Sequence, residues 1–253
     1  MIDNKKLVII MPAYNAEKTL EKTYEKIPHD IVDQIILVDD ASVDKTVDIS
    51  KSLGITTIVH KENKGYGANQ KTCYKNALET GADIIVMLHP DYQYDPRVIP
   101  FAVGFITTGI CDIIVGSRIR SRGEALEGGM PLYKYLSNRF LTAIENIVLG
   151  QNLGDFHSGF RVYKREVMEK IDYLHDSDDF IFDTEFLVQA IYNGFRVGDI
   201  PIPSHYFPEA SSINFKRSLK YGIQTLFVMV KYILQCTRVF RFSLFNFQSA
   251  GRS

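Results

Sequence analysis

The first half of the chain alternates between short apolar runs and longer amphipathic segments. Five apolar runs are predicted to be strands: residues 7–11, 34–38, 55–59, 83–88 and 112–115. Four segments between them are predicted to be helices: residues 17–27, 43–53, 67–80 and 96–108. Asn15 and Ser42 are expected to cap the first two helices, and Gly54 and Gly81 to end the second and third. Strands separated by such helices indicate βαβ units and a mainly parallel α/β sheet.

The second half of the chain is less regular. Residues 121–131 contain three glycines and are predicted to form a mobile loop. Further helices are expected at residues 132–149, 182–193 and 215–235, and short strands at 160–163 and 196–200. Because no linker is evident, we expect one domain over residues 1–214, followed by a C-terminal helix and tail over residues 215–253.

Composition limits the class of protein. The 253 residues are 45% hydrophobic and 23% charged, which suits a soluble α/β domain and excludes a largely disordered chain. No uninterrupted apolar run reaches about 18 residues, so no transmembrane helix is predicted. The three cysteines, Cys73, Cys111 and Cys236, lie far apart and indicate free thiols in a reducing compartment. The N-terminal segment lacks the layout of a signal peptide, so a cytoplasmic location is expected.

Charge is distributed unevenly along the chain. The net charge of −1 argues against a general nucleic-acid binder. Residues 210–253 contain seven Lys or Arg and no acid, whereas the first 209 residues carry 22 basic and 30 acidic residues, a net of −8. The tail is therefore predicted to be a basic amphipathic helix, which could lie on an anionic membrane, form a homodimer interface or cover the core.

Polar residues follow each of the five predicted strands. They occupy residues 12–15, 39–40, 63–67, 89–93 and 116–118. Any one of these segments could merely cap a helix or form a turn. The carboxyl ends of parallel strands meet at one edge of a sheet, where ligands bind, so together the five segments predict a ligand site.

The segment Gly65-Tyr66-Gly67 is not a dinucleotide-binding motif, because Gln70 occupies the place of the third glycine. It is not a P-loop either, since no Gly-Lys-Ser/Thr follows. The glycines are expected to let the backbone approach a ligand or to open a helix, and Lys64 could neutralise phosphate charge.

In combination these segments resemble family 2 glycosyltransferases of the GT-A fold, which have a Rossmann-like, mainly parallel sheet flanked by helices. They are similar to the dolichyl-phosphate mannose synthase-like branch. The resemblance covers about residues 7–212 and is carried by residues 12–15, 38–46, 63–65, 89–91, 116–118 and 158–161.

The resemblance implies a nucleoside-diphosphate sugar donor, linked to UDP or GDP. Either Asp39 or Asp40 would accept hydrogen bonds from the base or ribose, because carboxylates only accept; Asp40 could instead cap the next helix. The implied donor-binding residues are Pro12, Ala13, Tyr14, Asn15, Asp39, Asp40, Lys64, Gly65 and Pro90.

His89, Pro90 and Asp91 stand where the family usually has Asp-x-Asp, a motif that holds a divalent cation on the donor diphosphate. The resemblance therefore implies a metal site of Asp91, His89 and Gln93. An imidazole in place of a carboxylate suits Mn²⁺ better than Mg²⁺. Alternatively, His89 only hydrogen-bonds phosphate or packs at the strand end.

Three arginines, Arg118, Arg139 and Arg161, are candidate contacts to phosphate or acceptor, since a guanidinium donates paired hydrogen bonds. Each could instead form an ordinary ion pair. Ser211 and Ser212 precede the last predicted helix, where they could donate to phosphate or where Ser212 could cap the helix.

An inverting transfer to a hydroxyl needs a general base, whereas transfer to an ionised phosphate does not. By resemblance, the segment after Asp155 approaches the acceptor, so Asp155 is predicted to be the base or an acceptor contact. Asp183 and Glu185 are the alternative, and Arg118 completes the candidate catalytic group.

The sequence thus predicts a transferase that moves a sugar, with inversion, from a nucleoside-diphosphate sugar to a polyprenyl phosphate or glycan acceptor of the cell envelope. Mn²⁺ or Mg²⁺ would assist, and the enzyme would lie in the cytoplasm or peripherally at the inner membrane face. Two alternatives remain. A sugar-1-phosphate nucleotidyltransferase would have a Gly-rich loop after the first strand, which residues 12–15 lack. A sugar-nucleotide-binding protein without transferase activity would explain His89.

Overall fold

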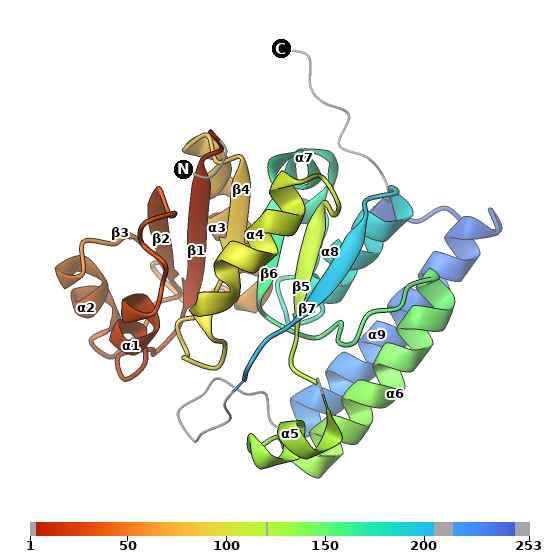
Figure 1. Cartoon of the computed structure of the whole chain (residues 1–253). Helices are drawn as coiled ribbons and strands as arrows, with labels where there is room; N and C mark the ends of the chain where they lie inside the picture. Colours follow the sequence, from red (N-terminus) through yellow and green to blue (C-terminus); the bar gives the residue numbers. More distant parts are fainter. Residues whose placement is uncertain (1–3, 120, 205–214, 246–253) are drawn as a thin grey trace.

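A computed structural model describes residues 4–119, 121–204 and 215–245 (Figure 1). Seven strands form one sheet in the order β3-β2-β1-β4-β6-β5-β7. The strands are β1 (Leu7–Ala13), β2 (Gln34–Asp39), β3 (Thr56–Val59), β4 (Ile84–Met87), β5 (Ile113–Ser117), β6 (Arg161–Lys164) and β7 (Val197–Pro201). Only β6 runs antiparallel to its neighbours, β4 and β5, which confirms the mainly parallel sheet.

Nine α-helices lie in the described part of the chain. They are α1 (Leu20–Glu25), α2 (Thr46–Ser52), α3 (Tyr66–Glu79), α4 (Ile99–Thr107), α5 (Arg122–Glu127), α6 (Leu132–Leu149), α7 (Arg165–Lys170), α8 (Phe182–Tyr192) and α9 (Phe215–Cys236). Short 3₁₀ turns occur at η1 (Pro96–Val98), η2 (Tyr173–His175) and η3 (Ser243–Phe245). Helix α5 lies inside the segment predicted to be a mobile loop. Its first turn is capped by Ser121, whose hydroxyl accepts from the Glu124 N–H at 3.2 Å.

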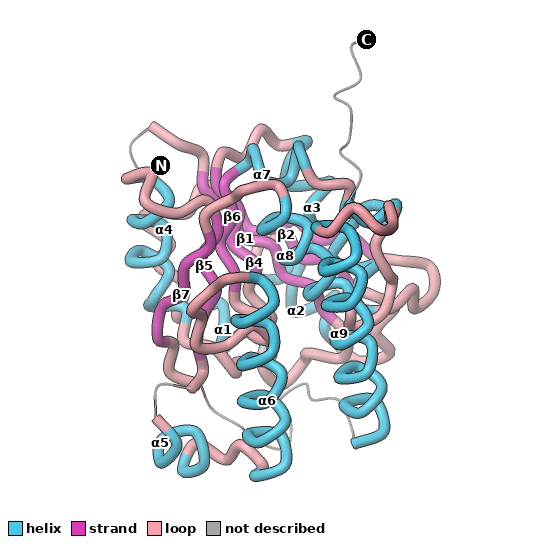
Figure 2. The backbone as a smooth tube through the Cα atoms, turned by 90° about the vertical axis from the view of Figure 1, so that its right-hand side faces the viewer, coloured by secondary structure: helices cyan, strands magenta, loops and turns pink. Residues whose placement is uncertain are grey.

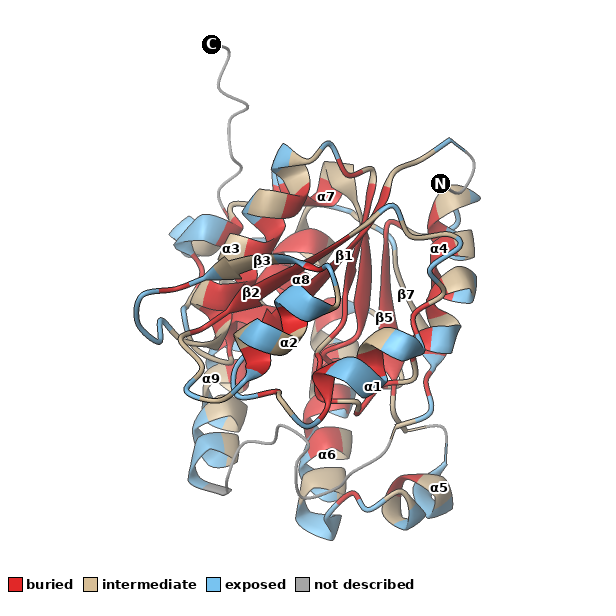
Figure 3. Ribbon diagram, turned by 90° about the vertical axis from the view of Figure 1, so that its left-hand side faces the viewer, coloured by how far each residue is buried: buried red, intermediate tan, exposed pale blue. Residues whose placement is uncertain are grey.

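Alternating side chains of the central strands bury both faces of the sheet. Val8 and Ile10 of β1 face a core that α3, α8 and α9 cover, whereas Leu7 and Ile9 face a core that α1 and α4 cover. Figure 3 shows the buried strands between helices whose outer sides are exposed. Strands with two buried faces explain the unbroken apolar runs in the sequence.

The last helix belongs to the core of the molecule. Helix α9 packs against α6 and α8, and its Val228 and Met229 are buried in the same core as α3 (Figure 2). A division at residue 214 therefore stays a prediction. Within the described residues, no helix has the length and apolar character needed to cross a membrane.

Candidate active site

Two adjoining cavities open at the carboxyl ends of the strands. The larger has a volume of about 580 Å³ and the smaller about 210 Å³. All five predicted strand-end segments contribute lining residues to one or both. Five residues line both cavities: Tyr66, His89, Asp91, Phe180 and Tyr221.

The end of β1 forms one wall of the larger cavity, through Pro12, Ala13, Tyr14 and Asn15. Asn15 has a positive φ of 52° and ties this wall to the loop after β2. Its side-chain oxygen accepts from the Val43 N–H at 3.0 Å, and its own N–H donates to the hydroxyl of Ser42 at 2.8 Å. The predicted helix caps at Asn15 and Ser42 are therefore wrong, because both side chains join two loops.

The two adjacent carboxylates at the end of β2 have different surroundings. Asp40 accepts from the N–H groups of Lys64 and Gly65, at 2.9 and 3.0 Å, and lies 2.7 Å from Nδ1 of His60. It thereby fixes the loop that leads into α3 and does not cap a helix. Asp39 is fully buried; its Oδ2 accepts from a backbone N–H, and its Oδ1 has no hydrogen-bond partner among the described residues.

The two glycines at the start of α3 allow another backbone segment to come close. A Cβ on Gly67 would lie 2.3 Å from the carbonyl oxygen of Ser177, and one on Gly65 would lie 2.7 Å from that of Asp178. The Gly67 N–H donates to the Asp178 carbonyl at 2.8 Å. The glycines therefore accommodate residues 177–178, and the exposed Lys64 side chain lines neither cavity.

Asp91 lies where the cavities meet and is 8% exposed. Its Oδ1 accepts from the Gln93 N–H at 3.0 Å. Burial raises the pKa of the Asp91 carboxyl, while the nearby His89 opposes the rise. Within the described residues, no group of three His, Cys, Asp or Glu side chains could hold a metal ion. The residues available for a metal at this point are therefore a carboxylate, an imidazole and an amide, from Asp91, His89 and Gln93.

Arg118 and Asp155 form a buried ion pair beside the smaller cavity. The Arg118 Nε lies 2.7 Å from Asp155 Oδ2, and Asn138 Nδ2 donates to Oδ1 at 2.8 Å. Burial alone would raise the pKa of Asp155, but the Arg118 charge and these hydrogen bonds hold it well below its usual range. Arg118 and Asn138 line the cavity, whereas Asp155 does not. Asp155 is thus poorly suited to be a general base, because it is fully buried and its pKa is low.

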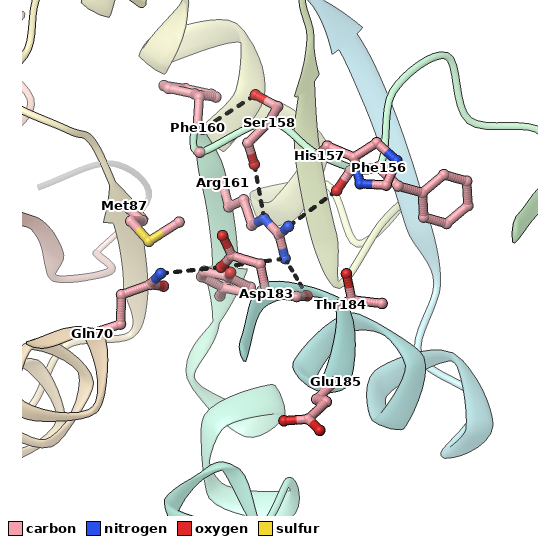
Figure 4. Close-up of polar contacts among 12 residues, drawn as sticks. Gln70, Met87, Phe156, His157, Ser158, Phe160, Arg161, Asp183, Thr184 and Glu185 are labelled. Atoms are coloured by element: carbon pink, nitrogen blue, oxygen red, sulfur yellow. Dashed lines mark hydrogen bonds and ion pairs between the residues drawn. The ribbon is translucent and has the colours of Figure 1, made fainter. Parts of the chain in front are cut away.

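Arg161 is fully buried and does not reach either cavity. Its guanidinium donates to the carbonyl oxygens of Ser158, Phe156 and Asp183 at 3.0–3.1 Å (Figure 4). This arginine therefore holds the segment before β6 against the start of α8. Because Arg161 is fully buried and lines neither cavity, its position does not support the predicted contact to phosphate or acceptor.

Arg139 also has a structural contact. Its guanidinium donates to the Gly154 carbonyl at 2.6 Å, and the residue lines neither cavity. The predicted acceptor contact at Arg139 therefore lacks support from its position. Ser211 and Ser212 lie outside the described residues.

Several cavity residues were not predicted from the sequence. Tyr221 of α9 joins three elements: its hydroxyl lies 2.8 Å from His157 Nδ1 and 2.9 Å from Thr184 Oγ1. His157 Nε2 lies 3.1 Å from the buried Glu145, at an angle outside hydrogen-bonding geometry. Lys134 of α6 lines the smaller cavity. His157 lies in the segment after Asp155 that was expected to approach the acceptor, but nothing in the sequence linked it to α6 or α9.

The family comparison covers most of the chain. A model of the family described as "Glycosyl transferase family 2" matches residues 8–172. The UDP-N-acetylglucosamine--dolichyl-phosphate N-acetylglucosaminyltransferase of Methanococcus voltae is 30% identical over 220 residues, spanning 80% of this chain and 87% of the relative. The polyprenol monophosphomannose synthase of Mycolicibacterium smegmatis is 27% identical over 206 residues, spanning 78% and 77%.

A solved structure shares the fold. Glucosyl-3-phosphoglycerate synthase from Mycobacterium tuberculosis, crystallised with Mn²⁺, UDP and phosphoglyceric acid, superimposes with a TM-score of 0.66 at 16% identity. The match covers 92% of this chain and 78% of that one. At this identity the likeness establishes the GT-A fold alone.

Proposed function

Because this chain belongs to glycosyl transferase family 2, we propose that its two cavities bind the donor and the acceptor of one sugar transfer. The donor is a nucleoside-diphosphate sugar, and the acceptor is a polyprenyl phosphate, as the names of the relatives suggest. The observation that carries the proposal is the common wall of the cavities, which holds His89 and Asp91. A sugar bound there would face the leaving diphosphate on one side and the acceptor on the other.

The larger cavity suits the donor. Its volume, about 580 Å³, lies in the range typical of small-molecule sites. Asp40 lines this cavity and is the candidate for the predicted base or ribose contact, whereas Asp39 is fully buried and lines neither cavity. Arg217 and Lys220 of α9 also line this cavity and are basic; Lys220 pairs with Asp179 of the same lining at 2.6 Å. These basic residues complement a diphosphate.

The candidate metal ligands Asp91, His89 and Gln93 suit a divalent cation such as Mn²⁺. Asp91 is a buried carboxylate whose protonation is favoured by burial, which a bound cation would reverse. Asp91, His89 and Gln93 offer oxygen and nitrogen ligands, and diphosphate oxygens and water would complete the coordination. When bound, the cation stabilises negative charge on the departing diphosphate. The basic residues of the cavity, Arg217 and Lys220, would hold the diphosphate next to the cation.

The smaller cavity suits an acceptor with a charged head and an apolar chain. Arg118 and Lys134 bring positive charge, while Met130 and Leu141 bring apolar surface. An ionised phosphate acceptor needs no general base, which agrees with the low pKa of Asp155. A glycan hydroxyl would need one, and Asp183 is then the candidate, because the other carboxylate that lines the cavity, Asp91, belongs to the proposed cation site.

The outer side of α6 and α9 suits an anionic membrane surface. The only carboxylate in these two helices is Glu145, which is 1% exposed. Both helices nevertheless expose large apolar side chains and carry basic residues, a combination that favours the interfacial region of an anionic bilayer. The exposed apolar side chains are Leu132, Leu136, Phe140, Ile147, Leu219, Ile223, Phe227, Val230 and Ile233.

Calorimetric titration with UDP or GDP and Mn²⁺, followed by transfer assays with the corresponding sugar nucleotides and a short polyprenyl phosphate, tests the function. We expect binding and transfer, both lost in Asp91→Asn and retained in Asp95→Asn, which lies in the same loop but lines neither cavity. Binding without transfer to lipid phosphate or glycan would favour a binding protein. Synthesis of sugar nucleotide from a sugar-1-phosphate would favour a nucleotidyltransferase.

Flotation with vesicles tests the membrane surface. Phe227→Glu should abolish binding to vesicles that contain phosphatidylglycerol, whereas Phe101→Glu, on exposed α4, should not. A concentration-dependent dimer that Phe227→Glu dissociates, with no vesicle binding by the parent protein, would instead assign this surface to a homodimer.

A further inference from the structure

His89 is held on one edge by its neighbours. Its ring stacks on Tyr66, with centroids 5.6 Å apart and planes 10° apart, and its Nε2 lies 3.2 Å from the Tyr66 hydroxyl. Gly159 packs against the same edge, because a Cβ there would lie 2.5 Å from Cδ2 and 2.7 Å from Nε2. No described residue hydrogen-bonds to Nδ1 of His89.

The direction of each hydrogen bond in this cluster follows from counting protons. The Tyr66 hydroxyl lies 2.7 Å from Oδ2 of Asp183. A phenol has an ordinary pKa of about 10, so near neutral pH it carries one proton. A carboxylate only accepts, so that proton points to Asp183. The phenol oxygen can then only accept from His89, whose Nε2 must carry a hydrogen.

Asp183 is fixed from its other side. Tyr74 donates to Oε1 of Gln70 at 2.8 Å, which sets the orientation of the Gln70 amide. The Gln70 Nε2 therefore donates to Oδ1 of Asp183, at 3.1 Å. The hydrogen bonds thus converge on Asp183, which accepts from Gln70 on the core side and from Tyr66 on the side of His89.

We propose that Asp183 and Tyr66 lock His89 in the tautomer that carries hydrogen on Nε2, which leaves the Nδ1 lone pair free to bind the divalent cation beside Asp91. Tyr66 and Asp183 are then positioning residues for a metal ligand. The inference rests on the proposed cation site. A ligating imidazole is commonly fixed in this way by the hydrogen bond of its other nitrogen, and loss of such a partner costs about 10–100-fold in metal affinity.

Nitrogen NMR of ¹⁵N-histidine-labelled, metal-free protein tests the tautomer, with the His89 signals assigned by their loss in His89→Gln. We expect Nε2–H in the parent protein. In Asp183→Asn the amide nitrogen should face Tyr66, because Gln70 holds the oxygen, so the phenol proton turns to His89 and the tautomer becomes Nδ1–H. Tyr173→Phe, a buried tyrosine away from both cavities, should change nothing. An Nδ1–H tautomer in the parent protein would overturn the proposal.

Mn²⁺ affinity, measured by electron paramagnetic resonance, tests the ligand role separately. Tyr66→Phe should weaken Mn²⁺ binding by about 10–100-fold. In the His89→Asp background the same substitution should have little effect, because a carboxylate has no tautomer. Equal losses in both backgrounds would refute the positioning role. If the parent protein has the Nε2–H tautomer and binds UDP but not Mn²⁺, His89 is not a metal ligand, and the proposed binding of the sugar nucleotide is unaffected. If the parent protein binds no nucleotide at all, the proposed function is contradicted instead.

Discussion

Asp176 is a buried carboxylate, and only one of its two oxygens has a hydrogen-bond partner among the described residues. It is 6% exposed; its Oδ1 accepts from Gln189 at 2.6 Å, and its Oδ2 has no hydrogen-bond partner among the described residues. Burial, followed by the charge of Glu185, raises the pKa of Asp176 to about 8. The residue directly precedes residues 177–178, which pack on Gly65 and Gly67, and it does not line the larger cavity.

Asp176→Asn should therefore stabilise the protein in a pH-dependent way. The folded-state pKa lies above the unfolded value, so the folded state retains a proton that the unfolded chain releases, and parent stability falls as pH rises. The advantage of the variant should grow by about 1.4 kcal/mol per pH unit between about pH 4 and pH 8. Taken over the difference between 3.8 and about 8, the ceiling is about 6 kcal/mol.

Urea denaturation at pH 5, 6, 7, 8 and 9 measures this advantage. Asp30→Asn, an exposed carboxylate, is the matched control and should give no pH-dependent gain. UDP affinity should be the same in Asp176→Asn as in the parent, because the residue lines neither cavity. A gain that does not change between pH 5 and pH 8 would refute the reasoning, since only the ionisation of Asp176 makes it pH-dependent.

Three further outcomes follow from buried contacts. Gly67→Ala should unfold the start of α3 or lower stability by about 1–3 kcal/mol, visible as a lower thermal midpoint, because its Cβ would meet the Ser177 carbonyl oxygen. Arg161→Lys should cost about 2–5 kcal/mol in urea denaturation, because one ammonium cannot reach all three carbonyls; a cost below about 1 kcal/mol would contradict this. Asp155→Asn should cost about 3 kcal/mol at pH 7, by leaving Arg118 buried without its counter-charge. The difference in stability between parent and variant should shrink as pH falls below about 4. There Asp155 takes up a proton in the unfolded parent but not in the folded parent, so the parent loses stability. A difference that stays constant with pH would contradict this expectation.

Apolar runs predicted the strands well because the sheet is buried on both faces. The helix predicted at residues 132–149 matches α6, since its apolar positions recur with helical spacing. The direction of β6 could not be predicted, because an apolar run of four residues does not encode which neighbour it pairs with. Helix α5 was missed because the three glycines of residues 121–131 also suit a loop, whereas the helix itself contains only Gly123 and is marked by the Ser121 cap.

Strand-end residues identified the site, but charged side chains within it were harder to assign. Arg118 and Arg161 follow similar motifs, yet one lines a cavity and the other satisfies three buried carbonyls. Residue type gives the chemistry of a guanidinium, whereas its direction depends on partners far along the chain, such as Asp155 for Arg118. The same applies to Tyr221, which reaches the site only because α9 packs beside α6 and α8.

The position of α9 also changes how the basic tail should be tested. Arg217, Lys220 and Gln224 share one helical face and line the larger cavity. Ile223 and Phe227 are exposed and line neither cavity. The basic residues of the C-terminal segment are thus not all on the outer surface, because Arg217 and Lys220 line the larger cavity. A chain ending after Lys220 would lose Tyr221 and Gln224 from the cavity wall and Val228 and Met229 from the core together with the exposed Phe227, so its failure to bind vesicles could not be assigned to the outer surface. Phe227→Glu leaves every residue that lines a cavity unchanged, and unchanged UDP affinity in that variant is the control that separates membrane docking from donor binding.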